Sequence, residues 1–313
     1  IYEVLVSSNT VSSEGDFLEY SYQWSFTTGQ NFHWQEQTLN TTRKLNSIYF
    51  SDSKTGWIVG ETSAIFKTLD GGNTWATQNA PNINNYRDVI FVNNTNGWIV
   101  GDSGNVIKTT NGGQNWELVN NPPNPAADLY GIHFIDANKG WTSGIGAIFA
   151  SIDSGNSWQY SNLVVNLYDI FFVDENKGWS VGANGNIYHT SNGGNNWGAQ
   201  TSNVSTHLRA VFFVNENLGW AVGDAGTILK TKDGGVNWSS MSKGNLSFYA
   251  VYFQNTNKGW IAGEKGIIYF TQDSGESWQQ QDSTTSKDLY AIHFSDAQTG
   301  WIVGESGLLL KGK

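Results

Sequence analysis

The sequence of 313 residues contains no cysteine. This absence excludes disulfide bonds, thiolate metal ligands and cysteine nucleophiles, and it leaves the cellular compartment open. Charged residues are sparse, at 14 % of the chain, and the arginines are Arg43, Arg87 and Arg209 alone. A net charge of −10 without a basic stripe argues against nucleic-acid binding. No run of about 18 apolar residues is present, so we expect no transmembrane segment.

Aromatic residues and glycine are abundant, at 14 % of the chain and 36 residues respectively. Fourteen of the fifteen tryptophans follow a repeating pattern. Gly-Trp pairs recur at nearly constant intervals and end at Trp57, Trp98, Trp141, Trp179, Trp220, Trp260 and Trp301. A second series follows the first six pairs, again at a nearly constant interval, at Trp75, Trp116, Trp158, Trp197, Trp238 and Trp278. A period of about 40 residues, with four short strand-like runs per unit, is typical of β-propeller blades.

The seventh Gly-Trp pair has no tryptophan after it, and the missing partner lies near the other terminus. The interval from Trp34 to Trp57 equals the interval from Trp75, in the second series, to Trp98 in the first. The repeat is therefore permuted across the termini, as expected of a closed ring. We predict an all-β fold, a seven-bladed β-propeller of four-stranded antiparallel blades. Its last blade should be closed by His33–Thr38 pairing with Leu308–Lys311.

The unit that begins at Leu208 predicts the strands of one blade. Its first run, LRAVFF, should be the innermost strand, buried on both faces. The Gly-Trp pair begins the second strand, where glycine lets neighbouring backbone approach and the indole fills the gap between blades. Gly223–Gly226 should form a tight hairpin whose glycines take positive φ. A third strand follows at Thr227–Thr231, and Trp238 enters the fourth, outer strand.

A Gly-rich turn precedes each tryptophan of the second series, as in Asp70-Gly71-Gly72-Asn73-Thr74-Trp75. This turn resembles the Asp-box of sialidase-type propellers. Its leading Asp or Asn side chain is suited to accept backbone N–H bonds across the turn. Each turn offers one firm carboxylate, whereas calcium takes about six to eight oxygen ligands. We therefore expect a structural role and no metal site.

The whole repeat, as in Gly219–Trp238, is Gly-Trp-x-Val-Gly-x-x-Gly followed by Lys-Thr and the Asp-box. It resembles the photosystem II stability/assembly factor-like family of propellers over residues 32–313. The resemblance implies the fold and a role in binding a client protein. In that family the second residue of each inner strand is often arginine, on a basic surface implicated in binding the client. Here only Arg87 and Arg209 follow that pattern.

Residues 1–31 lie outside the repeat, so we predict two parts, an N-terminal strand-rich arm or hairpin at 1–31 and the propeller at 32–313. Tyr2–Val6 and Phe17–Trp24 have the composition of strands, with Ser12–Asp16 as a turn between them. Two interpretations remain open. The segment is either a hairpin lying on the propeller or an arm that pairs with another chain.

The candidate binding site is the propeller mouth at the start of the inner strands. The second residue of each inner strand is Asn46 in the first blade and Tyr or Arg in the other six. These six candidate partner-binding residues are Arg87, Tyr130, Tyr168, Arg209, Tyr249 and Tyr290. Tyrosine and arginine are favoured in interfaces and in stacking against sugars. The alternative is that their side chains simply pack between blades.

Catalytic chemistry has weak support. Carboxylates recur after the Gly-Trp motif, at Glu61, Asp102, Asp224, Glu264 and Glu305. A glycosidase needs two carboxylates at a defined separation, but residues repeated in hairpin turns are better explained as turn formers. The histidines show no metal-ligand spacing, and His133 and His293 occupy a repeat position that is Tyr or Phe in other blades. We expect those two histidines to be packing residues.

These observations favour a non-enzymatic scaffold or assembly subunit that binds another protein, without catalytic residues, metal or cofactor. The high content of Asn, Ser and Thr, with few lysines, favours an extracytoplasmic location, whether periplasmic, secreted or at the cell surface. The alternative function is a glycan-binding module or, more remotely, a glycoside hydrolase. A mouth buried by another chain would favour the scaffold, and a groove with exposed aromatics and paired acids would favour the glycan.

Overall fold

The computed structural model describes residues 2–6, 22–26, 32–119 and 127–313. Within it the chain divides into two compact units, Ile1–Phe32 and His33–Lys313. The first unit contains β1 (Tyr2–Val6) and β2 (Tyr22–Phe26), which pair antiparallel with Tyr2 opposite Phe26. The predicted turn Ser12–Asp16 and the first part of the predicted strand Phe17–Trp24 lie outside the described residues. Independent folding of residues 32–313 stays a prediction.

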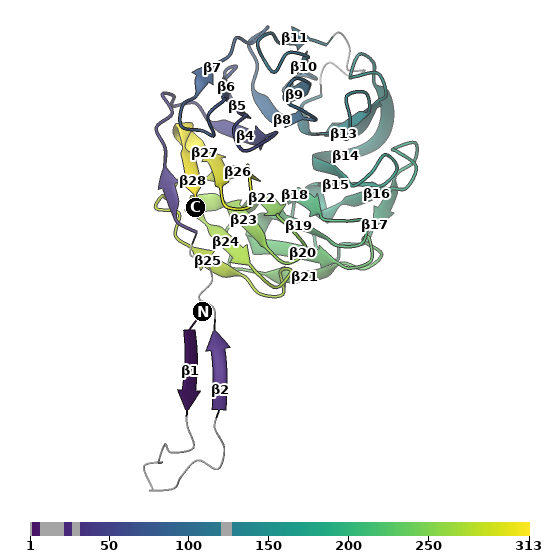
Figure 1. Ribbon diagram of the computed structural model, residues 1–313. Coiled ribbons are helices and arrows are strands. Elements are labelled where there is room, and N and C mark those ends of the chain that lie inside the picture. Colours follow the sequence, from purple (N-terminus) through teal and green to yellow (C-terminus); the bar gives the residue numbers. More distant parts are fainter. Residues whose placement is uncertain (1, 7–21, 27–31, 120–126) are drawn as a thin grey trace, which may run out of the picture. The chain divides into compact units, whose positions relative to one another are not determined.

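The second unit is the predicted propeller, a closed ring of seven four-stranded antiparallel blades (Figure 1). The first, innermost strands are β4 (Leu45–Phe50), β8 (Tyr86–Phe91), β12 (Leu129–Phe134), the second half of β14 (Gln159–Phe172), β18 (Leu208–Phe213), β22 (Phe248–Phe253) and β26 (Leu289–Phe294). The second strands are β5 (Gly56–Gly60), β9 (Gly97–Gly101), the first half of β13 (Gly140–Ser151), β15 (Gly178–Gly182), β19 (Gly219–Gly223), β23 (Gly259–Gly263) and β27 (Gly300–Gly304).

The third strands are β6 (Ile65–Thr68), β10 (Val106–Thr109), the second half of β13, β16 (Ile187–Thr190), β20 (Thr227–Thr231), β24 (Ile268–Thr271) and β28 (Leu309–Gly312). The fourth, outer strands are β7 (Ala76–Thr77), β11 (Glu117–Leu118), the first half of β14, β17 (Gly198–Gln200), β21 (Ser239–Ser242), β25 (Gln279–Gln281) and β3 (Trp34–Glu36). Short 3₁₀ turns join the second and third strands in four blades, at Ala183–Gly185, Asp224–Gly226, Glu264–Gly266 and Glu305–Gly307.

The ring closes where the sequence predicted. Strand β3, near the start of the chain, pairs antiparallel with β28 at its end, with Trp34 opposite Gly312. Backbone hydrogen bonds extend this pairing, because the Gln37 amide donates to the Leu309 carbonyl at 2.8 Å. The order β26-β27-β28-β3 thus makes a complete seventh blade from both ends of the chain.

The third and fourth blades depart from the regular pattern. Strands β13 and β14 each run through two strand positions, so the two blades share one six-stranded sheet. The cause is a shorter repeat, since Trp141 and Trp179 lie closer in sequence than any other two successive Gly-Trp tryptophans. With fewer residues between blades, the outer strand of blade three continues directly into the inner strand of blade four. Val164, at φ 53°, marks the bend within β14.

An aromatic ladder joins successive blades. The Trp57 indole stacks on the Phe91 ring of the next inner strand at 3.4 Å between centroids, and Phe91 meets Trp116 edge-on at 5.8 Å. The glycine of each Gly-Trp pair leaves room for a phenylalanine ring of this ladder. A Cβ at Gly56 would lie 2.7 Å from the ring of Phe50, so glycine admits an aromatic ring of its own blade rather than neighbouring backbone as predicted. The same Phe–Gly contact recurs in all seven blades.

The Gly-rich turns lock each blade to the one before it. The Trp57 indole N–H donates to the Gly112 carbonyl, in the turn of the next blade, and the Lys67 ammonium donates to the same oxygen at 2.7 Å. Trp98, Trp141, Trp179 and Trp220 make the corresponding indole bond. The turn is held by its own side chains, as expected. The Thr74 amide and the Thr68 hydroxyl both donate to Asp70 Oδ1.

The hairpin between second and third strands uses its glycines differently from the prediction. Gly223 is extended, at φ −168°, but a Cβ there would lie 2.0 Å from the His207 carbonyl oxygen. Positive φ falls instead on Ala225 (55°) and Gly226 (70°). The first glycine therefore permits close backbone approach, and only the second supplies left-handed backbone.

Candidate functional site

Every inner strand carries a β-bulge at its second residue. In β18 the ladder pairs Leu208 with Gly223 and then Ala210 with Val222, so Arg209 has no partner in the register. The same shift occurs in all seven blades. A bulge frees one residue from the ladder and re-aims its side chain. The candidate residues predicted from the sequence are these bulge residues.

The bulge residues surround one central cavity. Its volume is about 330 Å³, and its lining includes Arg87, Tyr130, Tyr168, Arg209, Tyr249 and Tyr290, together with Asn46. We call these seven residues the mouth ring. The prediction that inner strands are buried on both faces was wrong, because their second and fifth residues border this cavity and stay partly exposed, as in β4, β12, β18 and β22.

Neighbours in the mouth ring touch one another. Tyr130 and Tyr168 meet edge-on at 5.6 Å between centroids. The Arg87 guanidinium lies 5.8 Å from the centroid of Tyr130, and the Arg209 guanidinium lies 4.8 Å from that of Tyr168. Tyr249 and Tyr290 lie 5.4 Å apart between centroids. These ring side chains therefore pack on their neighbours and also keep an exposed edge, and their role in binding stays a prediction.

Both arginines are paired with an aspartate of their own blade. Arg209 Nε and Nη2 donate to the two oxygens of Asp224 at 2.8 and 2.9 Å, a bidentate pair. Arg87 Nε donates to Asp102 at 2.7 Å. Burial alone would lower the pKa of Arg87, but the hydrogen bond and charge of Asp102 raise it overall. Asp102 and Asp224 were expected to be turn formers only, and their pairing neutralises both arginines.

Acidic groups outnumber basic ones around the mouth ring. The cationic groups are Lys44, Arg87, Arg209 and Lys265. Lys44 lies 3.8 Å over the Tyr290 ring, and Lys265 lies 3.7 Å from Glu264. The carboxylates that act electrostatically on the ring residues and Lys44 are Glu61, Asp102, Asp128, Asp224, Glu264, Asp288 and Glu305. Among the described residues, seven carboxylates against four cations make the mouth acidic, in contrast to the basic surface that the family resemblance implied.

Two carboxyls inside the cavity were missed by the sequence reasoning. Asp88 and Asp169 follow a mouth-ring residue directly and line the same cavity. Asp88 accepts the Ser47 hydroxyl at 2.7 Å and the Ile132 amide at 3.0 Å. Asp169 accepts the amides of Ile170 and Val211, each at 2.8 Å. Each carboxyl therefore accepts a hydrogen bond from a backbone amide of the following blade. The sequence does mark these two aspartates, since the residue that follows the mouth-ring residue is Ser, Gly or Ala in every other blade.

The environment of these carboxyls favours their protonated forms. Burial raises the pKa of Asp88 to about 6. Burial, together with the nearby charge of Asp88, raises the pKa of Asp169 to about 8. Gly131 keeps the space open, because a Cβ there would lie 3.1 Å from an Asp169 carboxylate oxygen.

The fifth residues of the inner strands form the far wall of the cavity. His133 packs against Phe171 at 4.9 Å, and His293 packs against Tyr49 at 4.7 Å. Phe171, Phe212 and Tyr252 continue the series of ring contacts. Burial lowers the pKa of both His133 and His293 to about 4, so both imidazoles are neutral near pH 7. These contacts are the packing role predicted for the two histidines.

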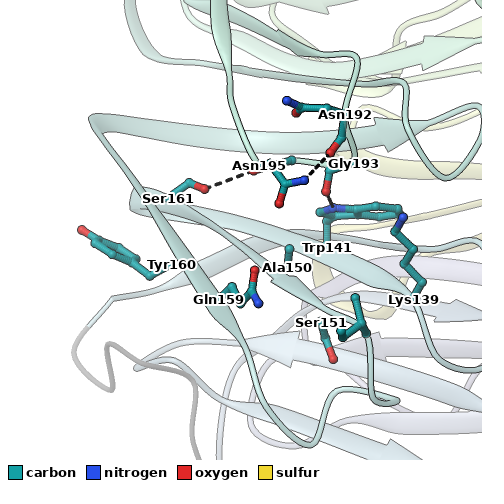
Figure 2. A pocket seen from close by; sticks show the side chains of 12 residues that line it. Lys139, Trp141, Ala150, Ser151, Gln159, Tyr160, Ser161, Asn192, Gly193 and Asn195 are labelled. Carbon is teal, nitrogen blue, oxygen red and sulfur yellow. Dashed lines mark hydrogen bonds between the residues drawn. The ribbon is translucent and has the colours of Figure 1, made fainter.

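A second pocket, of about 280 Å³, lies between the outer parts of blades three and four (Figure 2). Its polar groups are largely used in holding the two blades together. The Trp141 indole donates to the Gly193 carbonyl, and the Ser161 hydroxyl donates to the Gly194 carbonyl. The side-chain amide of Asn195 donates to the Asn192 carbonyl, as Figure 2 shows. Tyr160, at 49 % exposure, projects away from these groups. The pocket is a seam between blades and a weaker candidate than the mouth.

Within residues 2–6, 22–26, 32–119 and 127–313, no group of three or more His, Cys, Asp or Glu side chains is placed to hold a metal ion. In that same part of the chain, no helix is long and apolar enough to cross a membrane.

Known proteins match both the sequence and the fold. The family model described as photosynthesis system II assembly factor YCF48 matches residues 27–163, 160–247 and 241–313. Photosystem II assembly lipoprotein Ycf48 of Picosynechococcus sp. is 48 % identical over 44 residues. That match covers 14 % of this chain and 13 % of the relative, so only a small part of the relative's length is spanned.

Solved structures extend the similarity to nearly the whole ring. YCF48 bound to D1 peptide has a TM-score of 0.76 at 25 % identity, covering 89 % of this chain and 96 % of that one. YCF48 from Cyanidioschyzon merolae has a TM-score of 0.75 at 21 % identity, covering 89 % and 98 %, which shows a shared fold. Because the family model matches from residue 27 to residue 313, the chain belongs to the family of the photosynthesis system II assembly factor YCF48.

Proposed function

We propose that this protein is a non-enzymatic, extracytoplasmic propeller that binds a segment of a partner protein at the mouth ring. The observation that carries the proposal is the row of bulge residues. Six are Tyr or Arg, all border one cavity, and all stay partly exposed. Tyrosine and arginine dominate the energetics of protein interfaces because they combine apolar contact area with polar ends.

The bulge itself supports a binding role. These side chains lie outside the strand register, and the aromatic ladder and Gly-rich turns join the blades without them. Bulges are common beside functional sites, where they re-aim a side chain. The family relation supports a protein as the ligand, because a YCF48 structure contains a bound D1 peptide. The lipoprotein relative in Picosynechococcus sp. supports the extracytoplasmic location.

The remaining alternative is a glycan ligand or glycoside hydrolysis. A glycosidase uses two carboxyls whose pKa values differ, and Asp88 and Asp169 invite that comparison. Both carboxyls, however, accept backbone amides from within the ring, and the cavity is at the small end of ligand pockets, which span about 300–1,000 Å³. A side chain of a partner fits this space better than an oligosaccharide. Hydrolysis of a glycan by the pure protein would overturn the non-enzymatic assignment.

The proposal is tested by titrating the purified chain with a D1 peptide and with any protein that co-purifies with it. Arg209→Ala should weaken binding about tenfold or more, as truncation of an interface arginine does. Asp224→Asn is the matched control, because it removes the same ion pair and leaves the guanidinium in place. If the ring is only structural, both variants should lower the melting temperature alike and leave the affinity unchanged, which would contradict the proposal.

A further inference from the structure

We infer that the cavity beneath the mouth ring binds an organic ammonium group, such as the side chain of a lysine on the partner protein. The inference rests on the proposed function only for the source of that group. The binding site itself is formed by the carboxyls of Asp88 and Asp169 and by the tyrosine rings of the mouth ring, all of which line the same cavity.

The two carboxyls have no cation of their own. Within the described residues, the partners of Asp88 and Asp169 are backbone amides and the Ser47 hydroxyl. The two arginines at the mouth are committed to Asp102 and Asp224. A half-buried carboxylate without a counterion is destabilising, and a cation that enters the cavity would relieve that cost.

The protonation of the two carboxyls agrees with this lack of a counterion. The pKa of Asp169 is raised to about 8 by burial and by the charge of Asp88, so a proton occupies this carboxyl near pH 7. An ammonium group would replace that proton and supply N–H donors to the remaining lone pairs. Binding should therefore release a proton and strengthen as the pH rises.

The aromatic groups of the cavity suit the same ligand. Tyrosine faces attract cations, and three tyrosines of the mouth ring already have one: Arg209 lies 4.8 Å from Tyr168, Lys44 lies 3.8 Å from Tyr290 and Arg87 lies 5.8 Å from Tyr130.

Charge and size both favour a basic side chain. The seven carboxylates around the mouth exceed the four cations there, so the approach to the cavity attracts positive charge. The cavity volume of about 330 Å³ is sufficient for a lysine side chain.

The test uses n-butylammonium as a probe of lysine chemistry and n-butanol as its uncharged counterpart, added to the full chain at pH 8.5. Binding is followed by NMR at the amides of Ile132 and Val211, which donate to the two carboxyls. We expect saturable shifts with n-butylammonium and none with n-butanol at equal concentration. Equal shifts from both probes, or shifts only at amides outside the cavity, would overturn the inference.

Repeating the titration at pH 6 tests whether binding depends on the ionisation of the carboxyls. The probe keeps its charge, because primary amines titrate near pH 10.4. Protonation of Asp169 should weaken binding at least about fivefold relative to pH 8.5. Other titratable groups lining the cavity are Tyr49, Arg87, Tyr130, His133, Tyr168, Arg209, Tyr249, Tyr252, Tyr290 and His293. The two histidines have pKa values of about 4 and Tyr252 of about 12, outside this interval. Binding that is equal at both pH values would contradict the inference.

Substitutions of the two aspartates provide a second test. Asp169→Ala and Asp88→Ser introduce residues that other blades carry at this position, Ala210 and Ser47. Each should weaken n-butylammonium binding at least about fivefold. Asp174→Asn is the control, because it removes one carboxylate outside the cavity and Asn215 fills the equivalent place in the next blade.

If Asp169→Ala binds the probe as the wild type does, the inference fails. A variant that does not fold leaves the other variant and the pH series to decide. Loss of probe binding with partner binding intact refutes the ammonium site alone. Probe binding without any partner at the mouth refutes the proposed function alone.

Discussion

The indole of Trp301, in the last blade, stacks on the ring of Phe50, in the first, with 5.4 Å between centroids and 17° between planes. This contact continues the aromatic ladder across the junction of the chain ends. Lys311 strengthens the junction by donating to the Gly71 carbonyl at 3.1 Å. The last blade therefore contacts the first through the same two interactions that join the first blade to the second. One is a stacked indole, as at Trp57, and the other is a lysine that donates to a carbonyl of a Gly-rich turn, as at Lys67.

Deleting residues 1–38 should prevent stable folding. The deletion removes β3, and with it Trp34, which is 2 % exposed and meets Phe294 edge-on. The seventh blade then loses its outer strand and the edge of β28 is left unpaired. Deleting residues 1–31 is the control and should leave a ring with unchanged thermal unfolding. A folded, monomeric 39–313 fragment with the melting temperature of the full chain would contradict the closure account.

Trp220→Ala should lower the free energy of unfolding by about 3–5 kcal/mol, the usual range for truncating a core aromatic residue. Trp220 is fully buried, stacks on Phe253 at 3.4 Å and donates to the Ser274 carbonyl. Trp238→Ala should act similarly, since Trp238 is 5 % exposed and meets Phe213 edge-on. Val236→Ala, at 77 % exposure, should change stability by less than about 0.5 kcal/mol. Denaturant unfolding measures all three, and a neutral Trp220 variant would refute the ladder.

The Gly-rich turns predict a difference between two substitutions of one residue. Asp273 accepts the Ser277 amide at 2.9 Å and the Thr271 hydroxyl at 2.7 Å. Asp273→Ala should cost about 1–2 kcal/mol, because these two donors and the Ser277 hydroxyl, which donates to Asp273 Oδ2 at 2.6 Å, lose their acceptor. Asp273→Asn should be close to neutral, since Asn111 makes the same amide bond in the second blade. Equal losses from both substitutions would show that charge, rather than acceptance of hydrogen bonds, holds the turn.

Much of this architecture could be predicted from the sequence because it depends on repeated contacts. The spacing of the tryptophans determines the blade count, and the interval from Trp34 to Trp57 predicts the closing strand. The bulges could not be predicted, since register depends on how a strand meets its neighbour and each inner strand is continuous in sequence. The repeat does mark Asp88 and Asp169 as exceptions at their position, but their roles could not be predicted, because their hydrogen-bond partners include residues of other blades.

Asp169 should make the stability of the ring depend on pH. Its pKa of about 8 in the folded chain exceeds the value near 3.9 of an unfolded aspartate. Between these values the folded state holds a proton that the unfolded state has released, so this group destabilises the fold as the pH rises. The melting temperature of Asp169→Ala relative to wild type should therefore increase from pH 5 to pH 9. Asp174→Asn should run parallel to the wild type, and a parallel Asp169→Ala curve would disprove the raised pKa.

Site-specific photocrosslinking shows whether a partner protein binds at the mouth ring. A benzophenone amino acid replaces Tyr249 at the mouth in one variant and Tyr160, exposed on the outer edge of blade three, in another. Both are irradiated in the complex with the co-purifying partner. We expect the partner to be crosslinked from position 249 and not from position 160. Crosslinking from position 160 with none from position 249 would contradict this expectation.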